Sequence, residues 1–140
     1  MIDPLETVIA TLLLDEPLQA LVGDRIAAKH RYGVEWTAGQ AGIGVHLDGG
    51  EPDLYRPRQA VRIEVRMYAG SQAQAMKIWQ RLVQISRYWS GRQAVNTSNG
   101  AALLYALYQA SGPSLLFDQE LGMDFALAFF EAVVAEGAVG

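Results

Sequence analysis

The chain has 140 residues, of which 51% are hydrophobic and 19% charged, so it can form one globular domain with a core of its own. A net charge of -4 argues against a dedicated nucleic-acid binder, and the absence of cysteine rules out disulfides and thiolate metal sites. There is no basic leader and no apolar run of about 18 residues, so we expect a soluble, intracellular single domain over residues 1–140. The high apolar content favours an oligomer over a monomer.

Two helices are predicted at the start of the chain. Asp3 and Pro4 mark the first, because Asp caps free N–H groups and Pro is tolerated at the first helical position. Apolar residues then recur at helical spacing until Asp15-Glu16-Pro17 interrupts the pattern. A short second helix is predicted beyond this break, ending at Gly23-Asp24.

The next segment mixes weak strand signals with loops. Residues 25–28 are a candidate short strand, and residues 29–40 have no period, which predicts a loop. Within that loop, Trp36 is either an interface anchor or a side chain that covers the domain's own core. Residues 43–48 alternate between apolar and other residues, which predicts a strand, and residues 48–53 have the composition of a turn.

Residues 59–89 give the clearest signal in the chain. Apolar residues alternate over residues 61–68, which predicts a strand buried on one face. Ser71 lies three residues before Gln74, a capping-box spacing that predicts a helix from Gln72 onward. This helix has a broad apolar face, so it should lie across the inner face of the strand. The four inward strand residues are Val61, Ile63, Val65 and Met67.

The last third of the chain is predicted to be mostly strand. Residues 94–97 indicate a short strand, and Asn99-Gly100 is a two-residue hairpin signal. Residues 101–110 fit either a strand that is apolar on both faces or a short helix, and the preceding hairpin signal favours the strand. Ser111-Gly112-Pro113 is predicted to break the chain, and a loop is predicted over residues 114–122.

Two apolar features near the C-terminus need partners. Leu115, Leu116 and Phe117 are consecutive in the predicted loop, where they are either buried by the domain itself or docked onto a neighbouring subunit. The final strand, residues 123–133, is apolar on both faces. Such a strand is either central, with both faces covered, or placed at a subunit boundary.

These elements predict an α+β fold with a mainly antiparallel sheet of four to five strands. An N-terminal helix and one long helix should pack on that sheet. The strands at residues 43–48 and 60–68 should pair antiparallel, because their connection is too short for a crossover helix.

Catalytic constellations are hard to find in the sequence. The two histidines, His30 and His46, have no spacing that favours a metal site, and there is no nucleophile motif of the Gly-x-Ser-x-Gly type. Glu64 between Arg62 and Arg66 indicates a solvated or subunit-facing row of charges on one strand face. We therefore expect no enzyme activity, no metal and no cofactor.

Several stretches of the chain together resemble one family. The first stretch is the helix over residues 4–14, which leads into Ala20-Leu21-Val22-Gly23-Asp24-Arg25-Ile26. The second is the strand and helix over residues 61–89, with Tyr68-Ala69-Gly70-Ser71 at their junction. The third is the Phe117-Asp118 loop before a final apolar strand. In this order the chain resembles the tail terminator, or tail completion, proteins of long-tailed bacteriophages. Residues 29–41 and 98–110 depart from the resemblance.

The resemblance implies a structural role in the virion. Members of that family are small α+β domains in a hexameric ring, which caps the tail tube, stops its polymerisation and presents a surface to the head connector or stopper protein. DNA would pass through an acidic ring without specific binding. The protein would act at the neck between head and tail, after assembly in the host cytoplasm, and no membrane is involved.

Two alternatives to a tail terminator are a head-closure or head–tail adaptor protein and an intracellular α+β module that binds a ligand or peptide. An enzyme whose carboxylates are not grouped in the sequence is a third. Candidate residues for subunit or partner contacts are Trp36, Leu115, Leu116, Phe117, Phe130, Arg62, Glu64 and Arg66.

Overall fold

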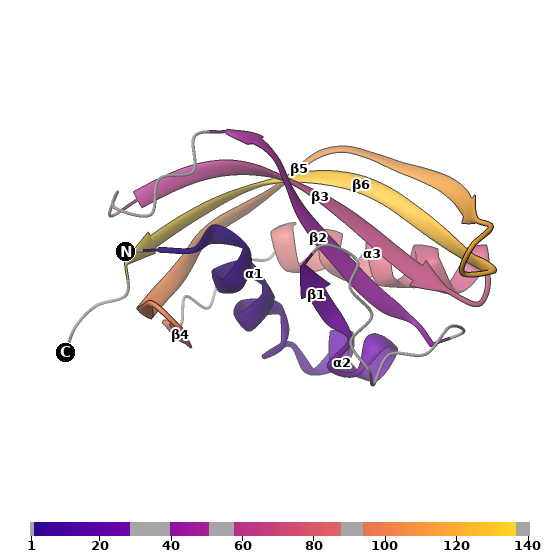
Figure 1. Cartoon of the computed structure of the whole chain (residues 1–140), viewed down its shortest axis with the longest axis horizontal. Helices are drawn as coiled ribbons and strands as arrows, with labels where there is room; N and C mark the ends of the chain where they lie inside the picture. The colour runs from indigo at the N-terminus through magenta and orange to yellow at the C-terminus, as the bar shows by residue number, and fades with distance from the viewer. Residues whose placement is uncertain (1, 29–39, 51–57, 88–93, 137–140) are drawn as a thin grey trace.

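The computed structural model describes residues 2–28, 40–50, 58–87 and 94–136. Figure 1 shows helices lying on one side of a curved sheet. The predicted α+β class is confirmed, but the described residues form six strands where four to five were predicted. The elements are α1 (Pro4–Leu12), α2 (Glu16–Val22), β1 (Ile26–Ala28), β2 (Gly42–Gly50), β3 (Arg58–Ala69), α3 (Gln72–Arg87), β4 (Val95–Thr97), β5 (Gly100–Asp118) and β6 (Met123–Glu136).

The strands lie in the order β1-β2-β3-β6-β5-β4. The predicted antiparallel pairing of β2 with β3 is confirmed, and β6 lies antiparallel between β3 and β5. The sheet is mixed, because β1 runs parallel to β2 with Ile26 opposite Ile43. The weak signal at residues 25–28 therefore does mark a strand, although three residues could not indicate its direction.

Side-chain caps define the two N-terminal helices. Asp3 accepts hydrogen bonds from the backbone N–H groups of Leu5 (3.0 Å) and Glu6 (3.3 Å), as predicted for the start of α1. Asp15 accepts from the N–H of Leu18 at 2.9 Å and so caps α2. The interruption predicted between the two helices is thus confirmed, and its acidic residue begins the second helix.

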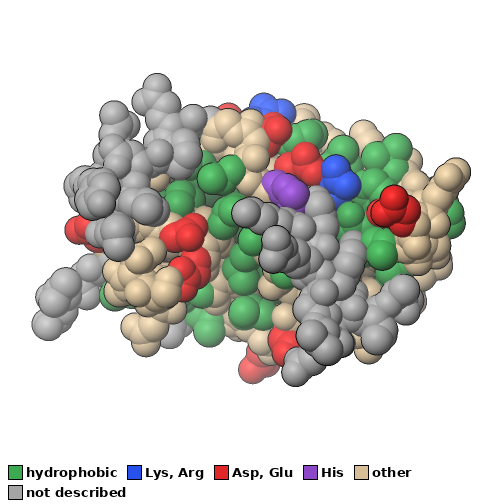
Figure 2. All heavy atoms as spheres, viewed as in Figure 1, with side chains coloured by type: hydrophobic (Ala, Val, Ile, Leu, Met, Phe, Trp, Pro, Cys, Tyr) green, Lys and Arg blue, Asp and Glu red, His purple; other side chains and the backbone are tan. Residues whose placement is uncertain are grey.

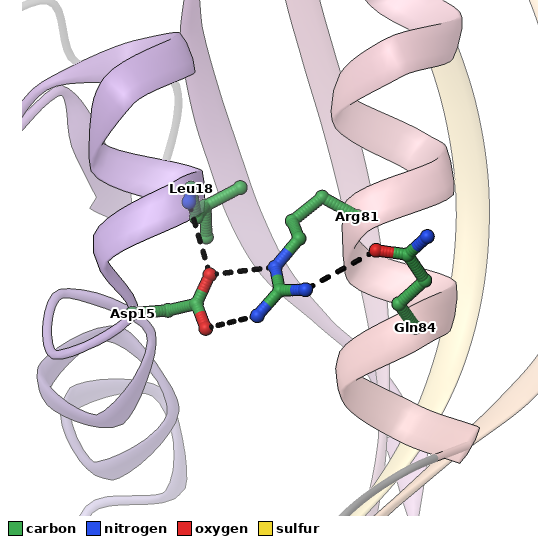
Figure 3. A network of polar contacts seen from close by, with 4 residues as sticks. All are labelled: Asp15, Leu18, Arg81 and Gln84. Atoms are coloured by element: carbon green, nitrogen blue, oxygen red, sulfur yellow. Dashed lines mark hydrogen bonds and ion pairs between the residues drawn. The ribbon is translucent and has the colours of Figure 1, made fainter.

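Asp15 also ties this helical corner to α3. Arg81 donates from Nε to Oδ2 of Asp15 at 2.8 Å and from Nη2 to Oδ1 at 2.7 Å, a bidentate ion pair seen in Figure 3. Arg81 also donates to Gln84 at 3.1 Å, which holds the guanidinium along its own helix. One carboxylate therefore caps α2 and joins it to α3.

The strand and helix of β3 and α3 form as predicted. Ser71 Oγ accepts from the N–H of Gln74 at 3.2 Å, as the predicted capping box requires, whereas the Gln74 side chain accepts from the N–H of Gly70 at 3.2 Å, one residue before the cap. The four alternating apolar residues of β3 are buried, and α3 packs across them. One core cluster contains Val61, Ile63, Val65 and Met67 together with Ile78, Leu82 and Ile85.

The predicted break at residues 111–113 is wrong, because β5 continues through it to Asp118. The Gly112–Pro113 peptide bond is cis, and the pairing with β6 shifts register between Gln109 and Ser111 and again between Ser111 and Ser114. The predicted loop over residues 114–122 is also wrong in its first half. Residues 114–118 pair regularly with β6, and only residues 119–122 form the turn.

The predicted hairpin before β5 is present with a shift of one residue. Thr97 pairs with Gly100, so the two-residue connection is Ser98-Asn99 rather than Asn99-Gly100. Gly100 begins β5 with a φ of 105°, a conformation that glycine adopts readily.

No helix in the described part of the chain is long and apolar enough to span a bilayer.

Candidate interaction surfaces

The row of charges predicted on β3 lies on the face of the sheet opposite the helices, here called the outer face. Arg66 Nε donates to Glu64 Oε1 at 2.6 Å, and Arg62 Nε donates to Asp48 Oδ2 of β2 at 3.2 Å. The Arg62 and Asp48 side chains are each 41% exposed, so their ion pair is screened by solvent. These residues are thus paired within the subunit and remain partly accessible to a partner.

Aromatic rings lie beneath the guanidinium groups of this face. Arg62 lies over the ring of Phe129 at 4.8 Å, and Arg66 lies over that of Phe125 at 5.4 Å. Such stacking covers apolar rings with charge and is favourable for arginine.

A hollow of about 320 Å³ opens beside Arg62 on the outer face. It is lined by Ala60, Val61, Arg62, Tyr108, Glu131 and Val133.

Arg66 is held firmly in its charged form. Burial opposes its charge most strongly, but hydrogen bonds to Tyr68 and Glu64 outweigh this, so the pKa of Arg66 is raised above its ordinary value. Tyr68 also contacts Phe125, with ring centroids 5.1 Å apart, in a small buried cluster with Met123. This end of the outer face is therefore closed by the subunit's own side chains.

Phe130 does not belong to an interaction surface of this subunit. It lies opposite Ile63 on the helix-covered face of the sheet, here called the inner face, and it is only 1% exposed. Its prediction as a contact residue is therefore corrected. β6 is central in the sheet, and its inner face is filled by the main core.

Three consecutive apolar side chains of β5 are exposed and form what we call the β5 apolar segment: Leu115 (42% exposed), Leu116 (43%) and Phe117 (57%). They were predicted in a loop, but they lie in a strand. Leu116 pairs with Phe125 and so lies on the outer face, whereas Leu115 and Phe117 pair with Ala126 and Asp124 and lie on the inner face. The described residues of this subunit leave all three substantially exposed.

The β5 apolar segment lies at an open edge of the sheet. β4 pairs only with residues 100–102 of β5. Within the described residues, no strand pairs with β5 beyond Ala102 on the side away from β6. An open strand edge offers backbone N–H and C=O groups that another chain can pair with.

A second hollow, of about 220 Å³, was not predicted from the sequence. It lies between α2, α3 and the start of β2, and we call it the α2–α3 pocket. Its lining residues come from three separate parts of the chain, so no local sequence pattern indicates the pocket. It is lined by Ala20, Leu21, Ala41, Gln74, Lys77 and Ile78.

The described residues on the face seen in Figure 2 do not form a basic surface of the kind that binds nucleic acid. Figure 2 shows acidic, basic and apolar side chains interspersed over one face, without a broad basic patch in its coloured, described part. Within the described residues no three His, Asp or Glu side chains group as a metal site. Trp36 and His30 lie outside the described residues.

No protein-family model matches this chain, and no curated protein matches it in sequence.

Proposed function

We propose that the protein is a structural subunit of a ring that caps the tail tube of a long-tailed bacteriophage. In this role it ends polymerisation of the tube and joins the tail to the head connector. The observation that carries the proposal is the β5 apolar segment, three consecutive apolar side chains that are 42–57% exposed at an open strand edge.

The three exposed apolar side chains of the β5 apolar segment favour a surface that binds another protein. An isolated exposed leucine is ordinary, but Leu115 and Phe117 lie on the inner face and Leu116 lies between them in sequence on the outer face, so both faces of the strand end are apolar and exposed. Exposed apolar groups of this kind mark interaction sites or aggregation hazards. At a strand edge the hazard is greater, because backbone pairing adds to the apolar contact. Stable association with copies of the chain, and with tail tube and connector proteins, would cover this surface.

The charge of the chain suits a passage for DNA. A net charge of -4 would give a hexamer a charge of about -24, and such a wall repels phosphate instead of retaining it. The outer-face arginines Arg62 and Arg66 are engaged with Asp48 and Glu64 in the subunit, which reduces their availability to phosphates. The proposed site of action is the virion neck, after assembly in the host cytoplasm.

The test uses purified chain and purified tail tube protein. Light scattering over a concentration series should give a closed oligomer, either alone or when tube protein is added. Electron microscopy should then show shorter tubes with the added chain at one end only. Tubes of unchanged length and without an end-bound ring would refute the proposal.

The same preparation separates a terminator from a neighbouring neck protein. A terminator should bind tube ends in the absence of head connector. A head-closure or adaptor protein should bind isolated connectors and leave free tube ends bare.

A further inference from the structure

We infer that Phe117 of one copy inserts into the α2–α3 pocket of the next copy, so that this single contact, repeated, closes the ring. The inference rests on the proposed function, because it names the subunit contact of the proposed ring. Its occupant is a second copy of this chain, for reasons of position, size and charge.

The position of the two features follows from the sheet register. Phe117 of β5 pairs with Asp124 of β6, which pairs with Ala69 of β3. On the other side of β3, Gly42 of β2 pairs with Tyr68, and Ala41, which lines the pocket, immediately precedes Gly42. Both features therefore lie at the same end of the strands.

They lie, however, on opposite flanks of the sheet, because β2 and β5 are separated by β3 and β6. Phe117 and the α2–α3 pocket also lie on the same face of the sheet. The Phe117 side chain is on the inner face, and α2 and α3 cover that face. Copies placed side by side bring the Phe117 flank of one to the pocket flank of the next. Such a contact joins two different surfaces, and it closes into a ring when the rotation between copies allows it.

The sizes of the two features match. A cavity of about 150 Å³ lined by apolar side chains holds a benzene molecule, and the α2–α3 pocket measures about 220 Å³. Four of its six lining residues are apolar: Ala20, Leu21, Ala41 and Ile78. Phe117 is 57% exposed on its own subunit, so most of its ring remains to be buried. A buried aromatic anchor in a pocket is the usual centre of a protein interface.

The charges around the two features are complementary. Residues 114–124 contain three carboxylates, Asp118, Glu120 and Asp124, and no Lys or Arg. At the pocket, Lys77 is exposed at the lining. Arg25 donates from Nε to the carbonyl oxygen of Ala41 at 2.6 Å, which adds a second cation beside the pocket. The acidic hairpin end of one copy would thus meet a basic rim on the next.

The first experiment uses one variant for each half of the contact. Phe117→Ala removes the inserted ring and keeps the pocket, whereas Ala20→Trp fills the pocket from an exposed helix position and keeps Phe117. Each should raise the concentration needed for assembly at least about tenfold, as expected for an interface anchor. Leu14→Ala, at a side chain that is 54% exposed, is the matched control for Phe117. Ala101→Trp, at an exposed strand position, is the matched control for Ala20.

A mixture of the two variants gives a result specific to this contact. The Phe117→Ala copy still has a pocket, and the Ala20→Trp copy still has a phenylalanine, so one contact can form between them. The mixture should contain a one-to-one dimer of twice 15.3 kDa, while each variant alone stays monomeric. A contact between the β5 apolar segments of two copies, without use of the pocket, would not give this dimer.

Exchange of charges supplies a second, independent test. Lys77→Glu should weaken assembly, and Glu120→Lys should weaken it as well, because each places like charges across the contact. The double variant restores the opposite signs and should recover assembly to within about threefold of the native chain. Salt should reduce the effects of both single variants.

The contact is overturned if either Phe117→Ala or Ala20→Trp assembles like the native chain, or if the mixed variants give no dimer. It is also overturned if the native chain stays monomeric at every concentration with tube protein present. Loss of tube binding without loss of self-association would mean that the tube protein occupies the pocket instead. Tube capping is scored separately by microscopy, so failure of the contact and failure of the capping function are distinguishable.

Discussion

The Asp15–Arg81 ion pair is the polar link between the N-terminal helices and α3, and its removal should lower the free energy of unfolding measurably. Both side chains are partly buried, at 20% and 28% exposed, and two charge-assisted hydrogen bonds of 2.7 and 2.8 Å join them. An exposed pair contributes about 0–1 kcal/mol and loss of one partner of a buried pair costs about 3–5 kcal/mol, so Arg81→Met should cost about 1–2 kcal/mol.

A second pair of variants separates the ion pair from the helix cap. Asp15→Asn keeps an oxygen that can accept from the Leu18 N–H, so it should lose only the charge interaction with Arg81. Asp15→Ala removes the cap as well and should cost about 1 kcal/mol more. Urea unfolding, followed by circular dichroism, measures each difference, and the cycle of Asp15→Asn with Arg81→Met gives the coupling energy.

The pKa of Asp15 determines how the stabilisation by the Asp15–Arg81 pair changes with pH. The hydrogen bond from Arg81 lowers the pKa of Asp15, against an opposing effect of burial and with further help from the Leu18 N–H. A carboxylate whose folded pKa lies below its unfolded value of about 3.9 stabilises the fold above that pH. Its contribution is lost as the pH falls through the folded value.

The stability difference between the native chain and Arg81→Met should therefore be constant from pH 7 to about 5 and shrink below about 4. A difference that stays constant down to pH 2, or a coupling energy below about 0.5 kcal/mol, would refute the assignment of stability to this pair.

Three further predictions concern the fold. Phe130→Ala opens a cavity in the core and should lower the free energy of unfolding in urea by about 3–5 kcal/mol. Phe117→Ala removes an exposed side chain and should change the stability of the monomer by no more than about 0.5 kcal/mol. Equal losses for the two variants would contradict the assigned burial. Gly112→Ala places a Cβ 2.8 Å from a backbone oxygen of β6 at a φ of 98°, so it should lower the melting temperature more than Gly100→Ala, which meets open space at a φ of 105°. Asp3→Ala should reduce stability by about 1 kcal/mol through loss of the α1 cap, and an unchanged urea midpoint would count against that cap.

The sequence predicted most reliably where several signals agree. For β3 and α3, strict alternation, a capping box and a broad apolar helical face indicate the same structure. The cap Asp3 was equally readable, because proline follows it directly. Asp15 was predicted only to interrupt the helical pattern, and its role as the cap of α2 comes from the structure. A local signal also indicated β1, but three residues do not encode the parallel direction of its pairing with β2.

The errors on β5 come from its position at the edge of the sheet. Pro113 has no N–H, which in a central strand would leave an unpaired acceptor and break the strand. At an open edge that loss is tolerated, so the strand continues through Gly112 and Pro113 with shifts in its register. Whether Gly112 and Pro113 end the strand depends on the position of β5 in the sheet. The sequence shows these turn residues but does not show that position.

The error on Phe130 has a different cause. Alternation correctly separates Phe129 from Phe130, but it does not say which of two apolar faces meets the helices. In the structure Phe130 enters the core, while Phe129 lies under the guanidinium of Arg62. A charged residue on the neighbouring strand therefore covers an apolar face, and this could not be predicted without the register.

The irregularities of β5 also decide where its edge can accept a partner. The register shifts between Leu104 and Ser114 interrupt the ladder with β6, and Pro113 removes one N–H from the same stretch. Bulges and prolines of this kind protect an open strand edge against indiscriminate pairing. Residues 114–118 pair regularly with β6 and carry the β5 apolar segment, so the accessible part of the edge is confined to the hairpin end. An interface at that end can be specific, because the rest of the strand is a poor template for a second chain.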